Sequence, residues 1–142
     1  MSTVAATPPH DVVARKIPLA GLIGGGIAVV ANLVVYALAL VAGLPLLVPM
    51  PPDLVAATLP FYSVIMSTIV GAIGGTIVFA LLARFTSRPV TIFIIISVVV
   101  TLASFGMPLS LPMSLDTILV LNFMHIVAAV AIVWALVTRT RA

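Results

Sequence analysis

Charged residues are scarce in this sequence. Asp, Glu, Lys and Arg make up 6% of the 142 residues, whereas 63% are apolar. Soluble domains carry about 25% charged residues. The composition therefore excludes an ordinary soluble domain and indicates an integral membrane protein. No segment outside the apolar runs is long enough to build a core of its own, which also excludes the chemistry of a soluble domain.

Cysteine is absent from the chain. Its absence excludes disulfides, thiolate metal ligands and cysteine nucleophiles, although it leaves the cellular compartment open. The six basic residues are scattered and do not form the patch that nucleic-acid binding requires. We therefore expect no cofactor, no metal site and no nucleic-acid partner.

Four apolar runs are long enough, or nearly so, to cross a bilayer, which takes about 20 residues per helix. The predicted spans are residues 17–42, 54–85, 90–105 and 115–137, and the short third span can extend into residues 106–111. They form one transmembrane domain over residues 15–142, preceded by a short tail over residues 1–14. The predicted fold is an all-α membrane protein with four transmembrane helices.

All the basic residues fall at one end of these spans: Arg15, Lys16, Arg84, Arg88, Arg139 and Arg141. Loops rich in Lys and Arg stay on the cytoplasmic side. We therefore expect both termini in the cytoplasm. Of the three acidic residues, Asp53 and Asp116 lie in the opposite loops, whereas Asp11 lies in the N-terminal tail.

The two outer loops resemble each other in sequence. Residues 43–53 and 106–116 both read G-x-P-L-x-x-P-M-x-x-D, at a shift of 63 positions. This match indicates an internal duplication that gives two tandem helical hairpins. Because each hairpin begins and ends on the same side, the relating axis should run along the membrane normal. The expected architecture is a pseudo-two-fold bundle whose two proline-rich outer loops lie side by side.

Glycines occur four residues apart in the first two spans. Gly21 and Gly25 lie in the first span, and Gly71 and Gly75 lie in the second. Rows of small residues let helix backbones approach closely in lipid. We expect these rows to pack against each other or to form a seam between copies of the chain.

A layer of polar residues is expected at one depth of the bundle. Its members are Asn32, Thr68, Thr101, Asn122 and His125. Ionisable residues inside spans often mark function, and histidine exchanges protons near neutral pH. The layer could line a small cavity or relay protons. The alternative is interhelical hydrogen bonding that only holds the bundle together.

Asp53 and Asp116 occupy equivalent positions in the repeat, each next to a predicted span. Paired carboxylates with loop carbonyls could hold a hard cation such as Ca²⁺. The alternative is that each carboxylate caps the helix that follows, by accepting its free N–H groups.

Three short sequences, at residues 32–36, 81–89 and 124–125, suggest a family. They read NLVVY, LLARFTSRP and MH. On these motifs the chain resembles a family of small bacterial proteins with four transmembrane helices, known as a domain of unknown function. The resemblance implies a bacterial inner-membrane location and no particular substrate.

Two functions remain open. The first is a structural or accessory subunit, whose partners are the lipid bilayer together with other membrane subunits or a second copy of the chain. The second is a small carrier or channel that uses the polar layer, and it predicts a cavity within the bundle. An enzyme is not expected, because no side chain is identified as an activated nucleophile.

Overall fold

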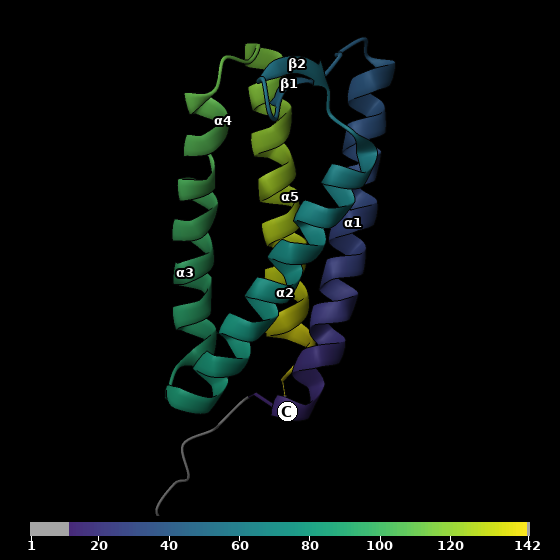
Figure 1. Ribbon diagram of the computed structural model, residues 1–142. Coiled ribbons are helices and arrows are strands. Elements are labelled where there is room, and N and C mark those ends of the chain that lie inside the picture. The colour runs from purple at the N-terminus through teal and green to yellow at the C-terminus, as the bar shows by residue number, and fades with distance from the viewer. Residues whose placement is uncertain (1–11, 142) are drawn as a thin grey trace, which may run out of the picture.

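The computed structural model describes residues 12–141, so residues 1–11 of the expected tail, including Asp11, lie outside the described range. The chain folds into helices with one small β-hairpin (Figure 1). The elements are a 3-10 turn Ala14–Lys16, α1 Ile17–Val41, β1 Leu47–Met50, β2 Val55–Thr58, α2 Phe61–Phe85, α3 Pro89–Ser104, α4 Gly106–Ser110 and α5 Leu115–Arg139.

Within residues 12–141, four helical segments are long and apolar enough to cross a membrane: Ala14–Val41, Phe61–Phe85, Pro89–Ser110 and Leu115–Arg139. The chain is therefore a multi-pass membrane protein, as its composition predicts. The third segment reaches its length by adding α4 to α3, which matches the expected extension past residue 105.

The predicted start of the second span at residue 54 is wrong. Residues 55–58 form β2 and pair in antiparallel fashion with β1, and α2 begins only at Phe61. The apolar residues after Asp53 extend the hydrophobic run in the sequence, so hydropathy alone does not separate them from the helix.

Local sequence explains several helix ends. Pro18 lies in the first turn of α1 and Pro89 begins α3, at positions where a missing N–H leaves no helical hydrogen bond unmade. At the end of α1, Gly43 has φ +81° and donates to Leu40 O, while Leu44 N donates to Ala39 O. This Schellman motif needs a left-handed residue, which glycine supplies at little cost. It turns the chain toward the β-hairpin.

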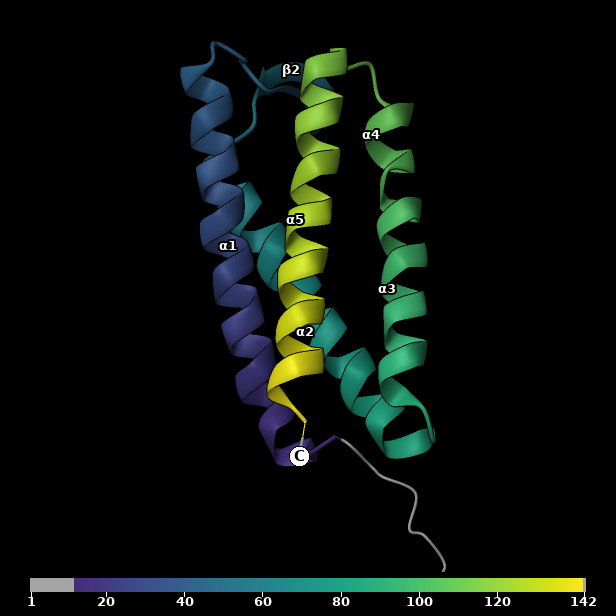
Figure 2. The same ribbon diagram turned by 180° about the vertical axis from the view of Figure 1, so that it is seen from behind.

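The helices are not packed equally. α1 packs closely along α5 and α2, whereas α3 makes sparse contacts with α2 and α5. α1 and α3 lie at opposite edges of the bundle, and α2 crosses obliquely between them (Figures 1 and 2). The two proposed hairpins thus differ in packing, and their outer loops differ as well, since one forms the β-hairpin and the other contains α4.

The hydrophobic core lies in the half of the bundle nearest the basic residues. We call this region the closed half, and its buried residues are Ile17, Ala20, Ala28, Ala72, Phe79, Phe93, Ile132, Leu136 and Val137. The ring centroids of Phe79 and Phe93 are 4.9 Å apart, so these two side chains pack α2 against α3. Beyond this contact α2 and α3 diverge, and that divergence creates the site described next.

Candidate functional site

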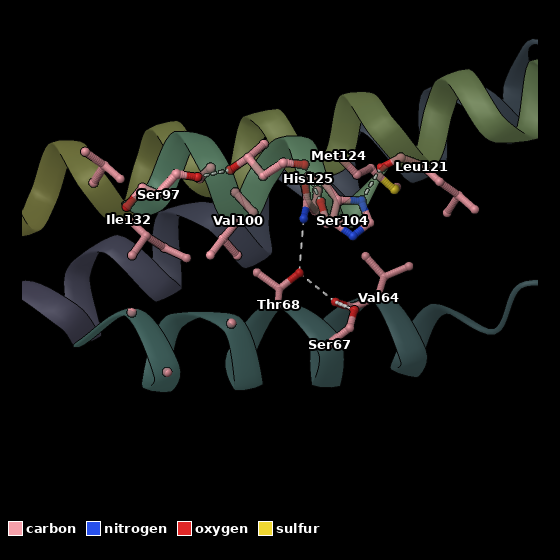
Figure 3. A pocket seen from close by; sticks show the side chains of 18 of the residues that line it. Val64, Ser67, Thr68, Ser97, Val100, Ser104, Leu121, Met124, His125 and Ile132 are labelled. Atoms are coloured by element: carbon pink, nitrogen blue, oxygen red, sulfur yellow. Dashed lines mark hydrogen bonds between the residues drawn. The ribbon is translucent and has the colours of Figure 1, made fainter. Parts of the chain in front are cut away.

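A cavity of about 690 Å³ lies between α2, α3 and α5 in the other half of the bundle, which we call the open half. Its floor includes Phe93 and Ile132 of the closed half. Figure 3 shows Ser67 and Thr68 of α2 on one side and His125 of α5 on the other, with their side chains directed into the shared space. The cavity is partly open to the surface of the bundle.

The structure brings four of the five predicted polar-layer residues to this cavity: Asn32, Thr68, Thr101 and His125. Asn122 is not among the lining residues, although it lies one helical turn from His125. Most members of the predicted layer therefore line one cavity, and Asn122 lies outside its lining.

Asn32 and Thr68 form a short hydrogen-bonded chain between α1 and α2. Asn32 Nδ2 donates to Thr68 Oγ1 at 3.0 Å, and Thr68 Oγ1 donates to Val64 O at 2.7 Å. Both side chains are buried, with 4% and 5% of their surface exposed. This contact is an interhelical hydrogen bond, the alternative to a proton relay that was stated for the polar layer. Both residues also line the cavity.

Other hydroxyl groups in the cavity donate to the backbone of their own helix. Ser67 Oγ donates to Val64 O at 3.2 Å, Thr101 Oγ1 to Ser97 O at 2.7 Å, and Ser104 Oγ to Thr101 O at 2.6 Å. A hydroxyl carries one proton, so each of these oxygens can offer only lone pairs to another molecule.

His125 is held by a contact within α5. Its Nδ1 lies 2.7 Å from Leu121 O. Because a carbonyl oxygen can only accept, Nδ1 carries a proton in this contact, and an uncharged ring with this tautomer has its free lone pair on Nε2. No carboxylate is among the residues that line the cavity within residues 12–141, so nothing charged orients the ring.

Two buried amide oxygens lack a hydrogen-bond partner, Oδ1 of Asn32 and Oδ1 of Asn122. An unpaired buried acceptor costs about 1–3 kcal/mol. Neither atom reaches the surface of the cavity in this conformation, since each has almost no accessible area. The two amide oxygens are therefore unpaired acceptors, whereas four hydroxyls of the cavity have hydrogen-bond partners.

The two glycine rows differ in how closely they pack against a neighbouring helix. A Cβ on Gly21 would overlap Thr76, and one on Gly25 would lie 2.9 Å from Ala72 Cβ, so this row does pack closely on α2. Gly71 has nothing within 4 Å of such a Cβ. The expectation that the two glycine rows meet each other is therefore wrong, because α2 presents Ala72 and Thr76 to α1 instead.

Gly71, Gly74 and Gly75 line the cavity. A Cβ on Gly74 would also meet nothing within 4 Å, and one on Gly75 would be 3.4 Å from Ile132. Their missing side chains therefore help to leave the space between α2 and α5 unfilled.

The two outer aspartates do not occupy equivalent structures. Asp53 lies in the exposed turn between β1 and β2, so the expectation that it caps a helix is wrong. Asp116 lies in the first turn of α5, where its charge favours the helix dipole, but the capping residue is Ser114, which accepts from Thr117 N at 3.3 Å. Among residues 12–141 no group of three or more His, Asp or Glu side chains could hold a metal ion.

The cavity includes hydroxyl residues that the polar layer did not contain, namely Ser63, Ser67, Ser97 and Ser104. The spacing of the lining residues in the sequence indicates that they share a helix face. On the α3–α4 segment, residues 93, 97, 100, 104 and 107 recur every three or four positions, which marks one helix face. A search for hydroxyls repeating on such a face would have found them.

Comparisons with known proteins give a family and no activity. No curated protein and no solved structure matches this sequence. A family of unknown function, DUF6069, matches residues 12–142, which is nearly the whole chain. The expectation of a small four-helix membrane family without a known activity is thus confirmed, and the chain belongs to the family of unknown function DUF6069.

Proposed function

We propose that the protein binds a molecule inside the bilayer, in the cavity of the open half, and serves as a small carrier for it. The supporting observation is the cavity itself. Its volume of about 690 Å³ lies within the roughly 300–1,000 Å³ of ligand pockets. Helices associate in lipid chiefly by packing against one another, and a bundle with a structural role alone gains stability by filling such a space.

The walls of the cavity also suit a ligand. Most lining residues are apolar or small, with a few polar groups on α2, α3 and α5. Pockets that bind small molecules combine an apolar lining with a few placed polar groups. The proposed role is binding and transfer without catalysis, because His125 contacts a backbone carbonyl and not a carboxylate.

Filling the cavity tests this function. Gly74→Leu adds a side chain to a residue that lines the cavity. Gly26→Leu adds the same side chain to α1, at a residue that does not line the cavity, and a Cβ at either position meets nothing within 4 Å. Wild type and both variants are purified in lipid nanodiscs, and their bound small molecules are extracted and identified by mass spectrometry.

We expect a molecule enriched over bulk lipid in the wild type and Gly26→Leu, and its loss in Gly74→Leu. Equal recovery from all three proteins, or no enrichment in any of them, contradicts a binding function for the cavity.

We propose further that the end with the basic residues faces the cytoplasm of a bacterial cell, so that the protein lies in the inner membrane with both termini inside. The support is the distribution of charge, since basic loops stay cytoplasmic. The absence of cysteine allows a direct test with single cysteines at two exposed positions, Ser87 and Thr58. A membrane-impermeant maleimide applied to intact cells should label Thr58→Cys and spare Ser87→Cys. The reverse pattern would invert the orientation.

We propose that the two hairpins descend from one duplicated hairpin. The support is the shared loop sequence G-x-P-L-x-x-P-M-x-x-D in residues 43–53 and 106–116. In this proposal the copies diverged, since α1 packs closely on its neighbours and α3 does not. The open half is then a product of that divergence. Related sequences in which the flanking spans match at the same shift of 63 would support it.

A second candidate function is the accessory subunit. One observation favours it: only 6% of the apolar window of segment 89–110 is buried within the bundle, against 17–28% for the other three segments. A partner helix or a second copy could cover this face. Gentle extraction followed by mass determination of the intact assembly separates the two, because a heteromeric complex favours the subunit and a lone chain favours the carrier.

A further inference from the structure

We infer that the ligand of the cavity is an uncharged, mainly apolar molecule whose polar group donates hydrogen bonds, that is, a lipid alcohol. This inference rests on the proposed binding function and adds the chemical class of the ligand. It follows from three properties of the cavity: the absence of charge, the direction of its hydrogen bonds, and the side on which it opens.

Charge limits the ligand first. The cavity is lined by no Asp, Glu, Lys or Arg within residues 12–141. A charged group buried in an apolar environment without a partner is strongly disfavoured. The phosphate of a phospholipid or the carboxylate of a fatty acid would therefore lie unpaired in this space, so the polar group of the ligand is neutral.

Hydrogen-bond direction limits it next. Six hydroxyl residues line the cavity: Ser63, Ser67, Thr68, Ser97, Thr101 and Ser104. The protons of Ser67, Thr68, Thr101 and Ser104 are already donated to backbone carbonyls. These four oxygens can accept from a ligand and cannot donate to it.

His125 adds another acceptor. With Nδ1–H donated to Leu121 O, an uncharged ring has its free lone pair on Nε2. The ring itself is exposed rather than packed into the helix interface, and Figure 3 shows it beside the cavity. Most polar groups of the cavity thus offer lone pairs, and a ligand that carries only carbonyl or ether oxygens would present lone pairs to lone pairs.

The opening of the cavity indicates how the ligand enters. Val100 and Met107 of the α3–α4 segment line the cavity and are 59% and 73% exposed. Gly71 and Gly74 of α2 also line it and are exposed. These residues lie along spans that face the hydrocarbon of the bilayer. The ligand therefore enters sideways from the membrane, with its hydroxyl inside the cavity and its apolar body extending toward lipid.

A pair of probes that differ in one donor tests the inference: 1-hexadecanol and its methyl ether. The protein in nanodiscs carries ¹⁵N-histidine, and a His125→Phe variant identifies the His125 signals, since the chain has two histidines. We expect the free protein to show His125 protonated on Nδ1, the atom that contacts Leu121 O. Hexadecanol should shift the Nε2 resonance toward the position of a hydrogen-bonded nitrogen, and the ether should not.

Competition between the two probes gives the size of the effect. The alcohol should bind about 2- to 13-fold more tightly than the ether, since one hydrogen bond to a neutral group contributes about 0.5–1.5 kcal/mol. Two variants separate the contribution of the hydrogen bond from that of the cavity space: His125→Phe and Gly74→Leu. The first should reduce the preference for the alcohol while binding persists, and the second should abolish binding of both probes.

The outcomes distinguish this inference from the function on which it rests. Equal binding of alcohol and ether, or tighter binding of palmitate than of either, overturns the assignment of a donor ligand and leaves a binding function in place. Failure of all three probes to bind, with no enriched molecule in the purified wild type, overturns the binding function itself.

Discussion

The two halves of this bundle are built from similar residues and differ in what the helices present to one another. In the closed half, Gly25 faces Ala72 and Phe79 packs on Phe93. In the open half, glycines and hydroxyls of α2 face hydroxyls of α3 across a cavity. Close packing in lipid requires that a small residue on one helix meets a neighbour that fills its space. Where small residues face each other across diverging helices, a cavity remains.

The largest effect should come from enlarging a glycine in the closed half. In Gly25→Leu the new side chain would have to displace α2, because its Cβ would lie 2.9 Å from Ala72 Cβ. Overpacking of this kind costs about 1–3 kcal/mol, and we expect about 2 kcal/mol. Reversible unfolding in bicelles measures the change, with Gly26→Leu as the matched control. Equal stability of the two variants would mean that α1 and α2 do not pack as described.

Breaking the polar contact between α1 and α2 should have the next largest effect. Thr68→Val keeps the shape of the side chain and removes the oxygen that accepts from Asn32 Nδ2 at 3.0 Å. Hydrogen bonds between transmembrane helices contribute about 0.6 kcal/mol on average and up to about 1.7. We expect a loss of about 1 kcal/mol in the same unfolding assay, because Asn32 is buried and has no other side-chain partner within residues 12–141.

The control for Thr68→Val is Ser67→Ala. The hydroxyl of Ser67 is exposed and bonds only to its own helix, so its removal should leave the stability within about 0.5 kcal/mol of wild type. A similar loss for both variants would show that the Asn32 contact adds nothing beyond the local bond.

The two ends of the described chain also meet in the closed half, and loosening them should have a small effect. Val13 N donates to Thr140 O at 2.7 Å, and Lys16 Nζ donates to Arg141 O at 2.9 Å. Lys16→Met removes only the second, exposed bond, and we expect a change below about 0.5 kcal/mol. The rate of hydrogen exchange at the Val13 amide should rise slightly. A loss of several kcal/mol in the free energy of unfolding would mean that the contact between the two chain ends stabilises the bundle more than this.

The smallest effect on stability should come from enlarging a glycine that lines the cavity. Gly74→Leu meets no neighbour within 4 Å of its Cβ. We expect the free energy of unfolding to stay within about 0.5 kcal/mol of wild type, although the cavity is filled. A loss as large as that of Gly25→Leu would mean that the cavity closes around Gly74 in the membrane, and would remove the difference between the two halves.

The sequence by itself predicted the features that depend on local composition. The scarcity of charge and the long apolar runs gave the class and the number of spans, because hydropathy is summed along the chain. The spacing of Asn32, Thr68, Thr101 and His125 from the span ends predicted a shared depth, because helical rise fixes depth, and all four line the cavity. The start of the second span failed, since β2 is as apolar as a helix end, and so did the helix cap expected of Asp53, which lies in the turn between β1 and β2.

Tertiary structure decided what depends on the facing residue of another helix. A glycine looks the same in the sequence whether it meets Ala72, as Gly25 does, or empty space, as Gly74 does. The divergence of α2 from α3 beyond Phe79 and Phe93 is likewise set by packing between helices distant in sequence. Helical periodicity gives the face of a residue on its own helix, but the crossing angle of two helices determines whether that face closes a contact or lines a cavity.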